Sequence, residues 1–256
     1  MPQIKSKGGS YIILDTKLSS QSFEIYLKQS NHKEHILVLN SPNNPTGAVY
    51  TNIEYVSLSE VCRKYQVIVL SDEIYSQLNF KDNFSPSISK YYPEGTIVFG
   101  GLSKVFSAGG YRLGFMSLPK ELNQLSIVYR SLFSETFSCV SSPVQFAAVK
   151  AYEYSDKLKE YVSISSAILH EISSYVFSEL LKNNIDCTNP EGVFYMMIGF
   201  NQFKTQIQSL GINTSNELAN YLLDTYQVAL LPGSDFGFEN TEFFLVCPLL
   251  ILMAKK

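Results

Sequence analysis

The chain has 256 residues, of which 45% are hydrophobic and 17% are charged, and its formal net charge is −3. This length and composition are enough to bury one large or two small globular cores. The balanced charge gives no basis for a nucleic-acid or anionic-membrane partner, and no run reaches the ~18 apolar residues of a membrane span.

The cysteines and histidines predict neither a disulfide framework nor a metal site. The four cysteines follow no CxxC or other regular spacing: Cys62, Cys139, Cys187 and Cys247. We expect them to be reduced, in a cytoplasmic protein. The three histidines are scattered, and neither His32 nor His35 has a cysteine nearby, so no metal is expected.

The first hundred residues alternate between strand-like and helix-like patterns. Short apolar runs predict strands at residues 11–14, 35–39, 67–71 and 96–99. Helices are predicted at residues 23–29 and 51–65, and Thr51 can cap the second of them. The expected inner face of that helix comprises Val56, Leu58, Val61 and Cys62. The alternation predicts an α/β fold with a mostly parallel sheet and helices on its faces.

The second half of the chain is mainly helical before it returns to strands. Helices are predicted at 122–133, 143–154, 156–181 and 215–226, and strands at 193–198 and 228–231. We place a domain boundary near Asp156, beside the longest helix. This gives a large domain over residues 1–155 and a small C-terminal α+β domain over residues 156–256.

Polar side chains follow three of the predicted strands. Asn44 lies in the turn after residues 35–39, Asp72 follows residues 67–71, and Lys104 follows residues 96–99. The carboxyl ends of parallel strands meet at one edge of a sheet, so these side chains should converge there and form a site. A lysine in such a place can serve as a nucleophilic amine. The alternative is a solvated lysine with no chemical role.

Five segments occur in an order that resembles one enzyme family. They are Ser-Pro-Asn-Asn-Pro-Thr-Gly (41–47), Asp-Glu-Ile-Tyr (72–75), Ser103-Lys104 with Arg112, Gly-Val-Phe-Tyr (192–195) and Pro-Gly-Ser-Asp-Phe-Gly (232–237). The chain resembles the class I/II aminotransferases, pyridoxal-phosphate (PLP) enzymes of fold type I. Gly-Leu-Ser-Lys (101–104) and residues 141–148 resemble the branch with alanine and aspartate-like transaminases. The resemblance implies part of that fold's large domain and a small C-terminal domain.

The resemblance also implies roles for the first site residues. Lys104 would form a Schiff base with the cofactor aldehyde and then move the proton between substrate and cofactor. Asp72 would hold the protonated pyridine nitrogen through a charge-assisted hydrogen bond. Asn44 and Tyr75 would bind the phenolic oxygen of the ring.

The phosphate of the cofactor would be bound by fewer residues than usual. The resemblance implies that the planar fork of Arg112 grips it and that Ser103 assists. Many relatives have a phosphate-binding serine three residues before the lysine, where this chain has Gly101.

Structural roles remain open for each of these residues. Asn44 could merely cap its turn, Asp72 could cap a short helix, and Tyr75 could belong to the core. Arg112 could pair with a surface carboxylate.

The chain departs from the family pattern at both ends. We expect an N-terminally truncated fragment, because the long stretch that normally precedes Gly9 carries phosphate-binding groups and much of the homodimer interface. The family's arginine for the substrate carboxylate is also missing, since the only arginines are Arg63, Arg112 and Arg130. With one added base, codons for residues 246–256 can read Arg-Leu-Ser-Phe-Val-Asp-Phe-Asp-Gly-Lys. An out-of-frame tail is therefore a hypothesis, which the nucleotide sequence tests.

The sequence thus predicts a PLP-dependent aminotransferase that moves an amino group between an amino acid and a 2-oxo acid, impaired by truncation. One alternative is a catalytically inactive fragment or pseudogene product. Another is a PLP-dependent lyase or synthase on the same fold. The expected partners are the two small molecules and a second copy in a weakened homodimer, with no nucleic acid and no membrane.

Overall fold

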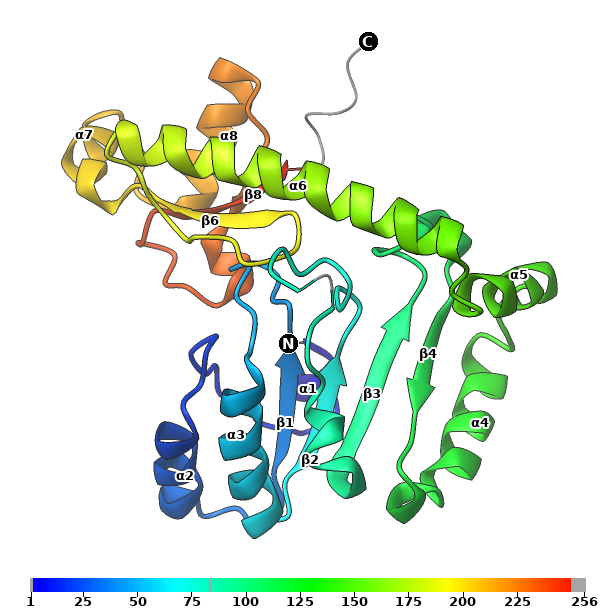
Figure 1. Cartoon of the computed structure of the whole chain (residues 1–256). Helices are drawn as coiled ribbons and strands as arrows, with labels where there is room; N and C mark the ends of the chain where they lie inside the picture. Colours follow the sequence, from blue (N-terminus) through cyan, green and yellow to red (C-terminus); the bar gives the residue numbers. More distant parts are fainter. Residues whose placement is uncertain (1, 83, 250–256) are drawn as a thin grey trace.

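The computed structural model describes residues 2–82 and 84–249 as two four-stranded sheets connected by helices (Figure 1). The last residues of the unusual tail, 250–256, lie outside the described residues. A long helix, α6 (Asp156–Lys182), runs across the top of the view from the first sheet to the second.

The first sheet has the order β1-β2-β3-β4. Its strands are β1 (Ile36–Asn40), β2 (Ile68–Asp72), β3 (Thr96–Gly101) and β4 (Gly114–Ser117). The first three strands are parallel, and β4 is antiparallel to β3. The carboxyl ends of β1, β2 and β3 therefore lie at one edge, and in Figure 1 this edge faces the second sheet. The predicted mostly parallel sheet is confirmed.

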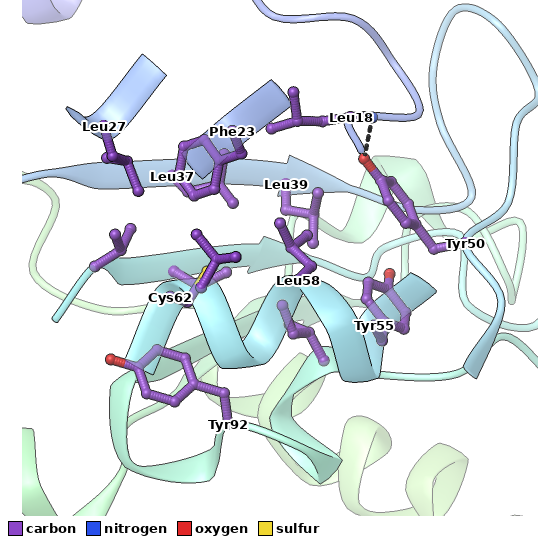
Figure 2. Close-up of a cluster of buried hydrophobic side chains, with 14 residues drawn as sticks. Leu18, Phe23, Leu27, Leu37, Leu39, Tyr50, Tyr55, Leu58, Cys62 and Tyr92 are labelled. Atoms are coloured by element: carbon purple, nitrogen blue, oxygen red, sulfur yellow. Dashed lines mark hydrogen bonds between the residues drawn. The ribbon is translucent and has the colours of Figure 1, made fainter. Parts of the chain in front are cut away.

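Two helices cover one face of the first sheet, α2 (Ser20–Gln29) and α3 (Asn52–Lys64). Thr51 begins α3 in a capping box, in which its side chain accepts from the Glu54 N–H and Glu54 reaches back. The core between these helices and the sheet contains Leu37, Leu58 and Cys62 (Figure 2).

One residue predicted on the inner face of α3 lies outside it. Val56 is 40% exposed, whereas the neighbouring Tyr55 is 1% exposed and stacks on Tyr50. Leu58, Val61 and Cys62 are buried as predicted. The buried face of α3 thus begins at Tyr55, whose ring reaches the core, and not at Val56, whose side chain is shorter.

After β4 the chain forms three successive helices, α4 (Leu125–Thr136), α5 (Ser142–Tyr152) and α6. The second sheet is antiparallel, in the order β5-β6-β8-β7. Its strands are β5 (Asp186–Cys187), β6 (Tyr195–Gly199), β7 (Leu231–Pro232) and β8 (Phe244–Pro248). The remaining helices are α1 (Pro2–Ser6), α7 (Lys204–Ser209) and α8 (Ser215–Tyr226).

One predicted strand is absent and another is shifted. Of the strand predicted at residues 228–231, only Leu231 lies in a strand, β7, and residues 228–230 do not. Residues 11–14 form no strand, and Ile12 and Ile13 are 49% and 62% exposed, because no other described strand pairs with them. The start of the unusual tail is a regular strand: β8 pairs with β6 and β7, and Leu245 and Val246 are fully buried. Among the described residues, no helix is long and apolar enough to cross a membrane.

Candidate active site

The first group at the strand edge is the turn after β1. The side chain of Asn43 organises this turn, because its Oδ1 accepts from the N–H and the hydroxyl of Thr46. Asn44 contributes only its N–H, which donates to Asn40 Oδ1 at 2.8 Å. Its side-chain amide instead lies 3.5 Å from the hydroxyl of Tyr75, to which it donates. The side chain of Asn44 therefore does not cap the turn.

Asp72 is the last residue of β2 and lies between Asn40 of β1 and Phe99 of β3 in the register. Its carboxylate is half-buried and accepts from the Ile74 N–H at 3.2 Å. Burial raises the pKa of this carboxyl group, although the Ile74 N–H and the positive charge of Lys104 act in the opposite direction. The carboxylate and the amine are thus close enough to interact electrostatically.

Lys104 follows β3 and places its amine over two aromatic rings. Its Nζ lies 5.6 Å from the ring centroid of Tyr75 and 5.6 Å from that of Phe194. Tyr75 is 4% exposed, so it also belongs to the core. Burial is the largest cause that raises the pKa of the Tyr75 phenol, which therefore stays protonated and can donate a hydrogen bond.

The residues predicted to bind phosphate lie in a more open part of the structure. Arg112 has a left-handed backbone conformation (φ 54°), is exposed, and donates from Nη1 to the Gly109 carbonyl at 2.9 Å. It makes no ion pair with a carboxylate of the described residues. Ser103 is half-buried. A Cβ at Gly101 would lie 2.8 Å from the Leu113 carbonyl, so the close approach of β4 excludes a serine there.

One buried side-chain atom at this edge has no hydrogen-bond partner in the described structure. Asn44 Oδ1 is buried and has no hydrogen-bond partner, which is costly unless a ligand or water supplies one. The Asn44 amide contacts the phenol of Tyr75, and Asp72 lies at the same strand edge. A phenol and a carboxylate are a donor and an acceptor of the kind that the polar atoms of a pyridinol ring need. The phosphate side is less complete, with Arg112 and Ser103.

Sequence reasoning missed the role of two neighbours. Phe194 is part of the Gly-Val-Phe-Tyr segment (192–195), and nothing in its spacing indicates contact with Lys104. Glu73 is half-buried, and its Oε1 accepts from Ser71 at 2.9 Å and from Ser87 at 2.5 Å. This pairing fixes the turn between Asp72 and Tyr75.

Two hollows lie near the site but are not lined by Lys104, Asp72 or Asn44. The larger, about 800 Å³, lies between β4, α4 and α5 and is lined by Phe115, Arg130 and Phe133 among others. The smaller, about 310 Å³, includes Glu73 and Gly100. No group of three or more potential metal ligands occurs within residues 2–82 and 84–249.

Comparison with known proteins identifies the family. Residues 12–249 match the family model of class I and II aminotransferases. An aspartate aminotransferase from Bacillus subtilis is 31% identical over 244 residues, an alignment that covers 92% of this chain and 59% of the relative.

Solved structures of aminotransferases have the same fold. The aspartate aminotransferase of Thermotoga maritima superimposes with a TM-score of 0.76 and 27% identity, over 96% of this chain and 61% of that one. The aromatic aminotransferase of Pyrococcus horikoshii gives a TM-score of 0.77 and 26% identity, over 91% and 58%. The chain thus spans about three-fifths of the length of these relatives. These class I and II enzymes are PLP-dependent. With its family model matched from residue 12 to residue 249, the chain belongs to the class I and II aminotransferase family.

Proposed function

We propose that this chain carries the ring-binding half of a PLP-dependent aminotransferase site, with Lys104 as the amine that bonds the cofactor. The observation that supports it most is the convergence of Lys104, Asp72, Tyr75 and an unpaired Asn44 oxygen at one strand edge. The proposed reaction moves an amino group from an amino acid to a 2-oxo acid, as the names of the relatives indicate.

Each side chain of the site has a definite task in this proposal. Asp72 accepts a hydrogen bond from the ring nitrogen and keeps it cationic. Asn44 and Tyr75 would hold the ring's phenolic oxygen, Arg112 and Ser103 would bind phosphate, and the Lys104 amine would accept and return the substrate's α-proton. When bound, the cofactor supplies an electron sink for the negative charge left by that proton.

None of the three arginines is assigned to the substrate carboxylate in this proposal. Arg63 is paired with Glu94, with Nε 2.6 Å from Oε1, and Arg130 lines the larger hollow. Arg112 is then the guanidinium nearest in sequence to the lysine and is assigned to phosphate. The described residues contain no guanidinium beyond these three.

The domain boundary, the oligomeric state and the cellular location are also proposals. We place the boundary at the start of α6, where the chain leaves the first sheet. We propose a homodimer only because homodimers are typical of the aminotransferase family. A cytoplasmic location is proposed on chemical grounds, because all four cysteines are free thiols.

Titration with PLP tests the proposal. The purified chain should develop a visible absorbance band, and Lys104→Ala should abolish it. Lys81→Ala is the matched control, since Lys81 forms an exposed ion pair with Glu191 and should leave the band unchanged. A band that survives in Lys104→Ala would contradict the assignment.

Turnover distinguishes the alternatives. A transaminase needs a 2-oxo acid as amino acceptor, whereas a lyase or synthase releases its product without one. Binding of PLP without turnover under either condition would favour the catalytically inactive fragment.

A further inference from the structure

We propose that Phe194 is a positioning residue that holds the amine of Lys104 in place from the second sheet. This inference rests on the proposed function only in making Lys104 the reactive amine. The Lys104 Nζ lies 5.6 Å from the ring centroids of both Phe194 and Tyr75. Attraction between an ammonium and a ring face acts over this distance.

The two rings form a fixed corner beneath the amine. Their centroids are 5.7 Å apart and their planes are inclined at 75°. Both rings are only 4% exposed, so neither can turn toward solvent. They belong to one core cluster, which Leu169 of α6 and Leu249 also join. The Lys104 amine therefore contacts one ring from each half of the fold, and both rings are packed in the same core cluster.

The backbone before Phe194 is strained in a way that sets the direction of its ring. Val193 has φ 61°, a left-handed conformation that β-branched residues rarely adopt. Such strain persists only where surrounding structure imposes it, and it clusters at functional positions. Here the Val193 N–H donates to the Leu78 carbonyl at 2.8 Å, and the Phe194 carbonyl accepts from the Leu249 N–H at 2.9 Å.

Gly192 allows this arrangement. A Cβ at that position would lie 2.5 Å from the Leu78 carbonyl, so only glycine permits the chain to approach so closely. Residues 192–194 are thus clamped against the segment that follows Tyr75. The ring of Phe194 is therefore fixed relative to the second sheet, and it is the group through which this sheet positions the Lys104 amine.

The amine's reactivity in the cofactor-free chain tests the inference. Lys104 should be acetylated by an amine-reactive ester about three- to tenfold faster in Phe194→Met than in the unaltered chain, because methionine keeps the volume and loses the ring. Peptide mass spectrometry at fixed pH measures the rate. Phe194→Tyr keeps a ring and should restore the slow rate. Phe203→Met removes a ring from the core around α7 and α8 and should leave the rate unchanged.

A second variant, which keeps the shape of the ring, provides the test if Phe194→Met does not fold. Pentafluorophenylalanine at position 194 keeps the size of the ring and reverses its quadrupole, so it should also accelerate acetylation. An unaltered rate in either variant, or equal acceleration in Phe203→Met, would overturn the inference. Because no PLP is present, these outcomes are independent of whether the chain binds the cofactor.

Discussion

At the scale of single residues, burial affects the protonation of two groups of the proposed site. Burial raises the pKa of both the Asp72 carboxyl and the Tyr75 phenol. For Tyr75 this keeps the donor protonated. For Asp72 the nearby Lys104 opposes the effect, so a cationic ring nitrogen at the same place would favour the ionised carboxylate further.

Asp72→Asn should weaken the binding of PLP about tenfold to a hundredfold. An amide cannot form the charge-assisted bond that the carboxylate offers to a cationic nitrogen, and such bonds contribute more than neutral ones. Equilibrium dialysis measures the affinity. Asp82→Asn, on the exposed loop that follows β2, is the control and should bind as the unaltered chain does. Equal affinities for Asp72→Asn and the control would contradict the role of Asp72.

At the scale of elements, one carboxylate connects three segments around the site. Glu191 lies 2.8 Å from Lys17 and 2.6 Å from Lys81 and accepts from the Val49 N–H at 3.1 Å. Burial alone would raise the pKa of Glu191, but these three donors outweigh it and lower the pKa to about 2.

This ion cluster predicts a loss of stability in acid. The folded pKa lies below the ordinary value of 4.5, so the stabilisation is complete above that pH and is lost as pH falls toward 2. Glu191→Gln should remove about 1–2 kcal/mol of unfolding free energy at pH 6 and flatten its decline between pH 4.5 and 2. Urea denaturation across this range measures both effects.

A second glutamate provides the contrast. Glu94 pairs with Arg63 at the surface, where its side chain is 38% exposed. Glu94→Gln should therefore change stability much less. If both variants showed the same pH profile, the Glu191 cluster would have no special role in joining these segments.

The elements also show why sequence alone predicted some strands and missed others. The runs that became β1, β2 and β3 are apolar and β-branched, so their pattern was sufficient. Strand β4 has four residues, includes a glycine and a serine, and is mostly exposed, so no periodicity marked it. The strand β8 exists because β6 and β7 pair with it on both sides, which is a tertiary effect.

The same distinction applies to the site. Asn44, Asp72 and Lys104 could be placed at one edge because parallel topology brings strand ends together. The contact of Phe194 with Lys104 joins residues 90 positions apart, one after β3 and the other before β6, so no local pattern could reveal it. The unpaired oxygen of Asn44 likewise depends on atomic packing.

At the scale of the whole molecule, the two sheets share a core. Tyr75 and Leu78 of the first half pack with Leu169, Val193 and Leu249 of the second. A shared core predicts that the described chain unfolds as one cooperative unit.

Two matched helix caps test this cooperativity. Thr51 and Thr214 each form a capping box, one at α3 beside the first sheet and one at α8 beside the second. Thr51→Ala and Thr214→Ala should each lower the unfolding free energy of one common transition by about 1 kcal/mol. Separate transitions, with each variant shifting only one of them, would show that the sheets unfold independently.

Large apolar side chains are exposed on the first sheet and on two of the helices. Ile36 and Val38 are 65% and 49% exposed on β1, and Ile127 and Phe146 are 75% and 77% exposed on α4 and α5. Exposed apolar surface on this scale is typical of interfaces.

We expect this chain alone to catalyse transamination weakly. In the proposed site Arg112 binds phosphate, and no other guanidinium is assigned to the substrate carboxylate. The loss of one such bidentate contact lowers kcat/KM about a hundredfold. The measurement is kcat/KM for amino transfer to a 2-oxo acid, compared with that of the Bacillus subtilis aspartate aminotransferase under the same conditions. Equal rates would show that another group binds the carboxylate.

The most direct test of the account is where PLP becomes attached. The chain is mixed with PLP and reduced with borohydride, and its peptides are then mapped by mass spectrometry. The account predicts that the phosphopyridoxyl group is found on the peptide that contains Lys104 and is lost in Lys104→Ala. Attachment spread over surface lysines, or its absence from Lys104, would contradict the account.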